Sequence, residues 1–378
     1  MNILVITRDY PPHTNGGIST AVWYEVQGLV AAGHRCTVVS FDAFRPVTQA
    51  LLTDQVPRID FSCSPAMITL SAPSAIPAAL EAARQARPDV IHLHHSTLLD
   101  FALDLSGGHV PIVKTVHVIQ HQMNWYRGLE STITSKAQAR AVATCWRAVV
   151  MSRAAAQMMA AEFPEFSDKF RVIAPGVPDQ PGAADASWPR PDRIAVHAGR
   201  FSDIKGTEVL FDVARGLTAA DPRNHVVIAG GLPDGQPSER RYMRKWARGA
   251  TGPDDERVSF PGWLDRSQLS ALFLQSSVYL ATSVFETFGL SIAEAMLHGV
   301  PVVATACGGP QEIIEHGVSG MVVPVGDTRA IVAAASSILD SPDRCAEMGR
   351  AARQSILKRF DVRTHTESLE AVYREVIS

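Results

Sequence analysis

The segment Phe285–Glu294, FETFGLSIAE, places two carboxylates on either side of a Phe-Gly step. The apolar run Val278–Thr282 precedes it and predicts a buried strand, and a helix is expected to begin near Gly289. A strand, a turn and a helix in this order are typical of an α/β fold. The unpartnered amides at the helix N-terminus favour an anion. Because carboxylates repel phosphates, Glu286 and Glu294 are expected to accept hydrogen bonds from hydroxyl groups.

The length and composition indicate a globular protein of two domains. A chain of 378 residues is too long for one ordinary core. Its net charge of −3 gives no reason to expect nucleic acid, and no apolar run is long enough to span a bilayer. The segment Met1–Thr7 reads as a first strand and not as a signal peptide. The five scattered cysteines form no C-x-x-C pair, which fits a reducing cytoplasm and argues against disulfides or structural zinc.

Short β-branched runs alternate with amphipathic stretches along the chain. After the Pro/Gly/Ala-rich stretch Pro175–Asp192 the alternation starts again, so the sequence predicts two doubly wound α/β domains joined by a hinge. Helices are expected at Ile18–Ala32 and Ile76–Ala86. The expected strands of the first half are Ile3–Thr7, Cys36–Ser40, Val90–His94, Ile112–Val116, Val149–Ser152 and Val172–Ala174. Those of the second half are Ile194–Ala198, Val226–Ala229, Val278–Ala281, Val300–Ala304 and Met321–Val323.

The spacing of Glu286 and Glu294 resembles the E-x7-E signature of retaining glycosyltransferases with the GT-B fold, family four in particular. The resemblance spans nearly the whole chain, through the motifs FPGW (260–263), HGVPVV (298–303), GGPQE (308–312) and GVSG (317–320), with matches at Gly16-Gly17, His117, Gly199-Arg200 and Lys205-Gly206. It implies two Rossmann-like domains facing a cleft. Residues 1–175 with 360–378 would bind the acceptor, and residues 176–359 would bind the nucleotide sugar.

Two cations follow the expected strand Ile194–Ala198. Arg200 and Lys205 suit a diphosphate, although by themselves they would more often be solvated surface cations. The resemblance implies that they hold the donor phosphates and neutralise the departing nucleotide. It also implies that Glu294 binds the ribose and Glu286 the sugar.

Further contacts to the nucleotide-sugar donor are expected from two other segments. Backbone donors to the diphosphate are expected from Phe288, Gly289 and Leu290. By resemblance, the segment 261–264, with Gly262 and Trp263, lines the base pocket.

The pair Gly16-Gly17 follows the first strand and opens the first helix. Glycine there lets a ligand approach the backbone, although a tight turn without a ligand explains the pair equally well. The loop is neither G-x-G-x-x-G nor a Walker A motif. In the resembled family it lies near the donor diphosphate.

Six histidines fall within residues 92–121, among them His92, His94, His95, His117 and His121. The close set His92, His94 and His95 has no carboxylate or cysteine within it in the sequence, so we expect polar lining or satisfied side chains here and no metal site. His117 follows the expected strand Ile112–Val116 and matches the family's active-site histidine. Val118-Ile119 then replace the small or polar residues usual there, which leaves the acceptor side open.

A basic stretch, Thr132–Ala161, contains no acidic residue. On one continuous helix Lys136, Arg140 and Arg147 would share a face. A solvated face is the favoured interpretation, because no bulky apolar edge stands opposite. Peripheral membrane contact, as in some relatives, and a subsite for a phosphorylated acceptor are the alternatives.

The resemblance implies a retaining, metal-independent hexosyltransferase without a cofactor, using a nucleoside-diphosphate sugar, with UDP favoured. We expect a soluble acceptor such as an aminocyclitol, inositol phosphate or secondary metabolite, and a cytoplasmic location. Two alternatives are transfer to a lipid-linked or cell-envelope glycan and nucleotide-sugar epimerisation on the same fold. A binding module without catalysis is a third, disfavoured because Arg200, Lys205, Glu286 and Glu294 are all present.

Overall fold

The computed structural model describes residues 1–11, 16–41, 58–60, 66–70, 76–126, 133–180, 190, 192–231, 237–247 and 255–378. These residues form two compact units. Unit 1 comprises Met1–Gly176 and Val362–Ser378, and unit 2 comprises Val177–Asp361. The domain boundaries expected from the sequence lie beside these divisions, while the roles assigned to the domains stay predictions.

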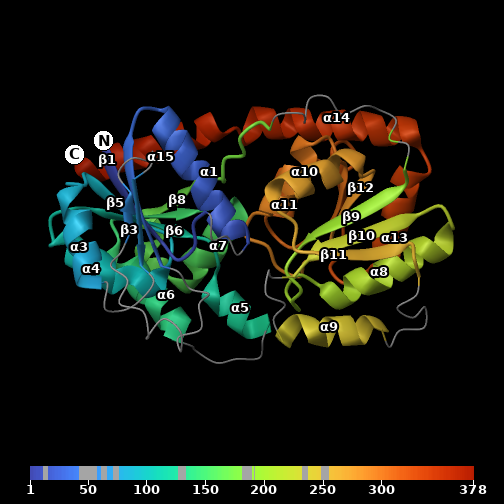
Figure 1. Cartoon of the computed structure of the whole chain (residues 1–378), viewed down its shortest axis with the longest axis horizontal. Helices are drawn as coiled ribbons and strands as arrows, with labels where there is room; N and C mark the ends of the chain where they lie inside the picture. Colours follow the sequence, from blue (N-terminus) through green and yellow to red (C-terminus); the bar gives the residue numbers. More distant parts are fainter. Residues whose placement is uncertain are drawn as a thin grey trace. The chain divides into compact units, whose positions relative to one another are not determined.

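Unit 1 is built on an eight-stranded sheet of order β3-β4-β2-β1-β5-β6-β7-β8, counted among the described residues (Figure 1). All neighbouring strands run parallel except β3 and β4. The order reverses between β1 and β5, where the carboxyl ends of parallel strands leave room for a ligand. The strands are β1 (Asn2–Thr7), β2 (Arg35–Phe41), β3 (Arg58–Asp60), β4 (Ala66–Leu70), β5 (Val90–Leu93), β6 (Ile112–Val116), β7 (Arg147–Val150) and β8 (Phe170–Val172).

Helices lie on both faces of this sheet, so its central strands β5 and β6 are buried along their whole length, including the polar residues His92, Lys114 and Thr115. Helix α15 packs beside α1: a side chain at Gly28 would overlap Thr366 of α15, so only glycine allows this approach. The helices are α1 (Gly17–Ala31), α3 (Ile76–Gln85), α4 (Leu99–Ser106), α5 (Gln120–Tyr126), α6 (Ile133–Thr144), α7 (Arg153–Glu162) and α15 (Val362–Ile377), with 3-10 turns η2 (Ser96–Leu98) and η3 (Pro164–Lys169).

Unit 2 has a parallel sheet of order β11-β10-β9-β12-β13-β14. In chain order, β9, β10 and β11 form one half of the sheet from its centre to one edge, and β12, β13 and β14 form the other half. The loops that follow β9 and β12 therefore lie next to each other at the switch point between the two halves. The strands are β9 (Ile194–Gly199), β10 (His225–Gly230), β11 (Val258–Gly262), β12 (Val278–Ala281), β13 (Val302–Thr305) and β14 (Gly320–Val323). The helices are α8 (Thr207–Ala220), α9 (Pro237–Ala247), α10 (Arg266–Gln275), α11 (Leu290–Leu297), α12 (Pro310–Ile313), α13 (Thr328–Leu339) and α14 (Pro342–Arg359).

The predicted elements are present, with several displaced bounds. The strand expected at Val149–Ser152 is β7, which ends at Val150 because Ser152 caps α7 by accepting a hydrogen bond from the Ala155 amide at 3.0 Å. The strands β3, β4 and β11 were not predicted. Of these, β3 pairs antiparallel, a pattern that the parallel reading of the sequence did not include.

Candidate active site

Two loops at the switch point of unit 2 are locked together. The Val284 amide donates to the Ile204 carbonyl at 2.8 Å, and the Thr282 hydroxyl donates to the Lys205 carbonyl at 3.0 Å. At Gly206, which caps α8 with a φ of 64°, a β-carbon would overlap the Thr282 carbonyl. Only glycine satisfies both the left-handed backbone and this close approach. The loops after β9 and β12 therefore hold their side chains at fixed positions.

Lys205 and Glu286, predicted as separate ligands, form an ion pair. The Lys205 Nζ atom lies 2.6 Å from Glu286 Oε2, and the Ser283 hydroxyl donates to the same oxygen at 3.3 Å. The side chains are 27% and 16% exposed, respectively. Such a partly solvated pair contributes little to stability, so both groups can exchange their contact for a ligand at small cost. Ser283 was missed by the sequence reasoning.

Arg200 follows the last residue of β9 and is exposed. It makes no hydrogen bond or ion pair with any residue in the described part of the chain. An exposed guanidinium in the loop that also carries Lys205 is suited to an anionic ligand, because it presents several donors in a fixed plane.

Helix α11 begins after Gly289, as predicted, and its entry is pinned by the GGP motif. The Gly309 amide donates to the Glu286 carbonyl at 2.9 Å, and the Glu286 amide donates to the Cys307 carbonyl at 3.1 Å. A β-carbon at Gly309 would overlap the backbone of Phe288. Gly289 itself has a φ of 109°. The first amides of α11, from Leu290 onward, have no helical acceptor and carry the positive end of the helix dipole.

Glu294 lies on the second turn of α11 and is 13% exposed. Its Oε1 atom is 3.9 Å from Arg266 Nη1, at the start of α10. Gly262 ends β11 with a φ of 75°, and Trp263 follows it. These positions precede α10, whose start is fixed by a capping box of Asp265 and Gln268. Arg266 was not singled out from the sequence.

His197 is a further buried polar residue of unit 2 that the sequence reasoning missed. Its Nδ1 atom lies 2.9 Å from the Leu280 carbonyl, which can only accept, so Nδ1 carries the proton. Burial lowers its pKa to about 4, and the positive charge of Lys205 acts in the same direction. Gly199 leaves the other ring nitrogen accessible, since a β-carbon there would stand 3.2 Å from Nε2. The ring is thus a neutral acceptor. The sequence signal that could have identified His197 is a histidine within an otherwise apolar strand.

In unit 1, the predicted glycines lie at the start of α1, while Asn15 lies outside the described residues. Gly16 has a φ of 129° and a ψ of −164°, a region reserved for glycine, and its carbonyl accepts from the Ser19 hydroxyl at 2.8 Å. Gly17 is exposed, and a β-carbon there would meet nothing within 4 Å. The turn therefore explains Gly16, and the open space at Gly17 is compatible with a ligand.

His117 lies directly after β6 and is buried. Its Nε2 atom is 2.9 Å from His94 Nδ1. Burial holds the pKa of His117 well below its usual range, so the ring is neutral at pH 7. The loop that follows is fixed by Gln138 of α6, which donates to the Val118 carbonyl at 2.6 Å and accepts from the Gln120 amide at 2.9 Å.

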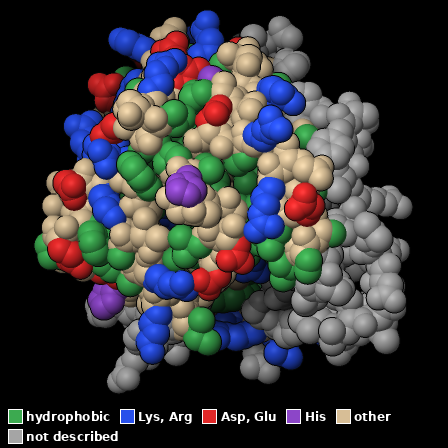
Figure 2. All heavy atoms as spheres, turned by 90° about the vertical axis from the view of Figure 1, so that its left-hand side faces the viewer, with side chains coloured by type: hydrophobic (Ala, Val, Ile, Leu, Met, Phe, Trp, Pro, Cys, Tyr) green, Lys and Arg blue, Asp and Glu red, His purple; other side chains and the backbone are tan. Residues whose placement is uncertain are grey.

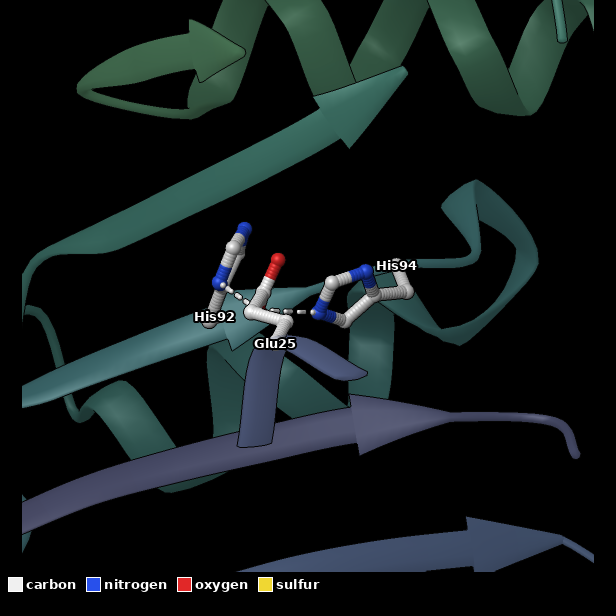
Figure 3. A group of neighbouring side chains, drawn as sticks. All are labelled: Glu25, His92 and His94. Carbon is white, nitrogen blue, oxygen red and sulfur yellow. Dashed lines mark ion pairs between the residues drawn. The ribbon is translucent and has the colours of Figure 1, made fainter. Parts of the chain in front are cut away.

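The histidine cluster does include a carboxylate, contrary to the interpretation from the sequence. Glu25 of α1 lies beside His92 and His94, and Figure 3 shows its carboxylate between the two rings. The sequence reasoning missed Glu25 because this residue lies on α1, far from the histidines in the chain, at a buried helical position. His95 belongs to a different environment, since its Nδ1 atom accepts from the Arg8 amide at 3.1 Å.

The predicted basic face does not exist as one helix. Helix α6 ends at Thr144, and Arg147 begins β7. Arg140 pairs with Asp100 at 2.7 Å, and Arg147 pairs with Glu375 at 2.6 Å. Figure 2 shows cationic and anionic side chains interspersed on the described part of one face. Among the described residues, no helix has both the length and the apolar character needed to cross a membrane.

Comparisons with known proteins agree with this architecture. The profile of the family "Glycosyltransferase Family 4" matches residues 15–180, and that of "Glycosyl transferases group 1" matches residues 183–355. A D-inositol 3-phosphate glycosyltransferase of Saccharomonospora viridis is 30% identical over 77% of this chain and 70% of its own length. The chain belongs to the group 1, family 4 glycosyltransferases.

More distant relatives of this glycosyltransferase cover its whole length. The glycogen synthase of Mycobacterium tuberculosis is 26% identical over 99% of this chain and 94% of its own. The structure of HepE from Anabaena, solved in complex with UDP and glucose, aligns over 99% of both chains at 20% identity with a TM-score of 0.72. The two α/β units are therefore those of the GT-B fold.

Proposed function

We propose that this glycosyltransferase moves a sugar from a UDP-sugar to a hydroxyl group of a soluble small molecule, with retention of anomeric configuration. The observation that carries the proposal is the Lys205–Glu286 pair at the switch point of unit 2, where the loop that carries Lys205 also carries the exposed Arg200. The UDP in the HepE complex and the name of the inositol-phosphate relative support the choice of donor and acceptor class.

The donor is bound by unit 2 in this proposal. Arg200 and Lys205 face the diphosphate, together with the backbone amides at Phe288, Gly289 and Leu290. Glu286 accepts from sugar hydroxyls, and it does so once Lys205 has turned from it to phosphate. The 2.6 Å ion pair thus keeps both side chains extended and ready before the donor arrives.

The nucleoside end of the donor lies farther along unit 2. Glu294 accepts from the ribose hydroxyls. Gly262 and Trp263 line the base pocket, where the open space around Gly262 allows a ring to approach the backbone.

Catalysis then depends on charge stabilisation. The bond to the nucleotide breaks when negative charge on the β-phosphate is stabilised, which Arg200, Lys205 and the amides of α11 supply as fixed positive groups. The acceptor hydroxyl attacks from the same face, and its proton passes to the departing phosphate oxygen. With these groups in place, no metal ion is needed to neutralise the leaving group.

Unit 1 supplies the acceptor side, through His117 with Gly16 and Gly17. A neutral His117 suits contact with a sugar hydroxyl, because it adds no charge next to a developing oxocarbenium ion. A soluble acceptor is favoured over a membrane one because Arg140 and Arg147 are engaged by carboxylates. We place the reaction in the cytoplasm, in keeping with the four buried free cysteines among the described residues.

The test is a two-stage screen of the full chain. A donor nucleotide present at 100 times its Kd should stabilise the protein by about 2.7 kcal/mol, so UDP should raise Tm where ADP and GDP do not. UDP-sugars are then incubated with inositol phosphates and aminocyclitols, and the product's anomeric configuration is read by NMR. Release of UDP with an α-linked product from an α-linked donor supports the proposal. An epimerised sugar without acceptor, or transfer only to lipid-linked glycans, contradicts it.

A further inference from the structure

A carboxylate and three imidazoles converge inside unit 1. Glu25 Oε1 lies 2.8 Å from His92 Nδ1 and 3.2 Å from His94 Nε2, and Glu25 Oε2 lies 3.5 Å from His365 Nε2. The four side chains come from α1, β5, the residue following β5, and α15. Glu25, His92 and His94 are buried, and their ligand atoms lie within 4.8 Å of one another.

Each imidazole is held by its other nitrogen. His92 Nε2 lies 2.7 Å from the Thr115 hydroxyl, and His94 Nδ1 lies 2.9 Å from His117 Nε2. His365 Nδ1 lies 2.8 Å from the Ala174 carbonyl. Histidines that bind a metal are oriented in this way, with the outer nitrogen on a hydrogen-bond partner and the inner one on the ion.

The inner atoms are poorly satisfied as they stand. The Ala174 carbonyl can only accept, so a neutral His365 carries its proton on Nδ1 and turns the lone pair of Nε2 toward the carboxylate. Glu25 Oε1 and His94 Nε2 are buried and have no hydrogen-bond partner of acceptable geometry among the described residues, although the two atoms lie close together. Buried carboxylate and imidazole atoms in this state are costly unless a cation joins them.

No lysine or arginine forms an ion pair with Glu25 in the described residues. The buried Lys114 Nζ instead donates to the carbonyls of His94 and Thr115. The hydroxyl of Tyr373 forms a hydrogen bond of 2.7 Å with His92 Nδ1, a contact that His92 would exchange for the ion. The carboxylate therefore lacks a permanent positive partner.

We propose that Glu25, His92 and His94 bind a zinc-class divalent ion. Imidazole nitrogens favour zinc over magnesium or calcium. In a tetrahedral site with bonds of about 2.1 Å, neighbouring ligand atoms lie about 3.4 Å apart. Glu25 Oε1 lies 2.8 Å from the ligand nitrogen of His92 and 3.2 Å from that of His94, and the three ligand atoms lie within 4.8 Å of one another, so small side-chain movements would bring them to these separations. The site is buried, so its role is structural: it ties α1 to β5 and to the residue that follows it.

The test measures metal content and does not depend on activity. Untagged full-length protein is produced with zinc in the medium, dialysed and analysed by inductively coupled plasma mass spectrometry. We expect about one ion per chain. Glu25→Gln and His94→Gln should reduce this at least tenfold. His298→Gln, which removes a buried histidine of unit 2, should leave it unchanged.

A second measurement covers the case in which the variants fail to fold. Wild-type protein is unfolded in denaturant with chelator and refolded with zinc, with cobalt or without metal. Refolding with zinc should raise Tm by several degrees, and cobalt should give the visible absorption of a tetrahedral site. Substoichiometric metal in the wild type, together with the same Tm after refolding with and without zinc, would overturn the proposal. Glu25 would then be held by a protonated imidazole.

Discussion

Glu286 and Glu25 both lie beside nitrogen-containing side chains, but they differ in their exposure to solvent. Glu286 of unit 2 pairs with Lys205 at a partly solvated switch point. Glu25 of unit 1 is enclosed by three histidines and has almost no contact with solvent. A charge near water can exchange partners, whereas a buried one is fixed because separation is costly. We therefore expect Glu286 to be able to exchange its contact for a ligand, and Glu25 to maintain the fold.

The largest expected effect is kinetic and falls on the cations of unit 2. Lys205→Ala and Arg200→Ala should each lower kcat/KM by about 10²–10³ if they stabilise the developing phosphate charge. Their Tm should stay close to that of the wild type, because the pair is partly solvated. Steady-state kinetics and thermal unfolding check both statements. Lys245→Ala, which removes an exposed lysine paired with Glu208 on the same unit, is the control. Unchanged turnover in both variants would remove these cations from the site.

Substitutions of Glu294 and Glu286 should affect different kinetic parameters. Glu294→Ala should mainly raise the donor KM, because a ribose contact is felt about equally in the ground and transition states. Glu286→Ala should also lower kcat, by about tenfold or more, because a contact to the sugar orients the anomeric carbon. Kinetics at saturating acceptor measure the difference. An intact donor KM in the first variant, or an intact kcat in the second, would contradict the roles assigned here.

Alanine substitutions at Gly206 and Gly262 should destabilise unit 2 to different extents, even though both glycines have a positive φ. Gly206→Ala drives a methyl group into the Thr282 carbonyl and should cost about 3 kcal/mol or more. Gly262→Ala meets no neighbour and should cost only about 1–2 kcal/mol, the cost of a left-handed backbone. Denaturant unfolding of the two variants compares the costs directly. Equal losses would mean that the close approach of the loops after β9 and β12 contributes nothing.

The smallest expected effect is that of a chelator on turnover. Because Arg200, Lys205 and the amides of α11 supply the positive charge, initial rates should be unchanged by EDTA added at the start of the assay. The ion proposed in unit 1 is buried and would not exchange during such an assay. Loss of rate on addition of EDTA, with recovery by Mg²⁺ or Mn²⁺, would assign a metal to the donor phosphates.

In the candidate site of unit 2, the sequence predicted the course of the backbone better than the side-chain partners. The turn at Gly289 and the start of α11 follow from local pattern, and the structure has both. The pairing of Lys205 with Glu286 joins residues 81 positions apart, which no local pattern can reveal. Glu25 was missed for the same reason. Arg147 was placed on one helix with Lys136 and Arg140 from their spacing alone, yet it begins β7, which pairs with β6 and β8.

Helix α15 follows unit 2 in the chain but belongs to unit 1, beside α1. During translation, unit 2 is complete as a continuous segment before α15 has been made. Unit 1 is therefore the first unit to be started and the last to be completed. Glu25 has been synthesised, but its neighbour His365 is added only after residues 177–361. A ribosome that stalls anywhere within unit 2 therefore leaves the earlier unit without α15, and Glu25 without His365. Quality control of this enzyme should recognise that open first unit.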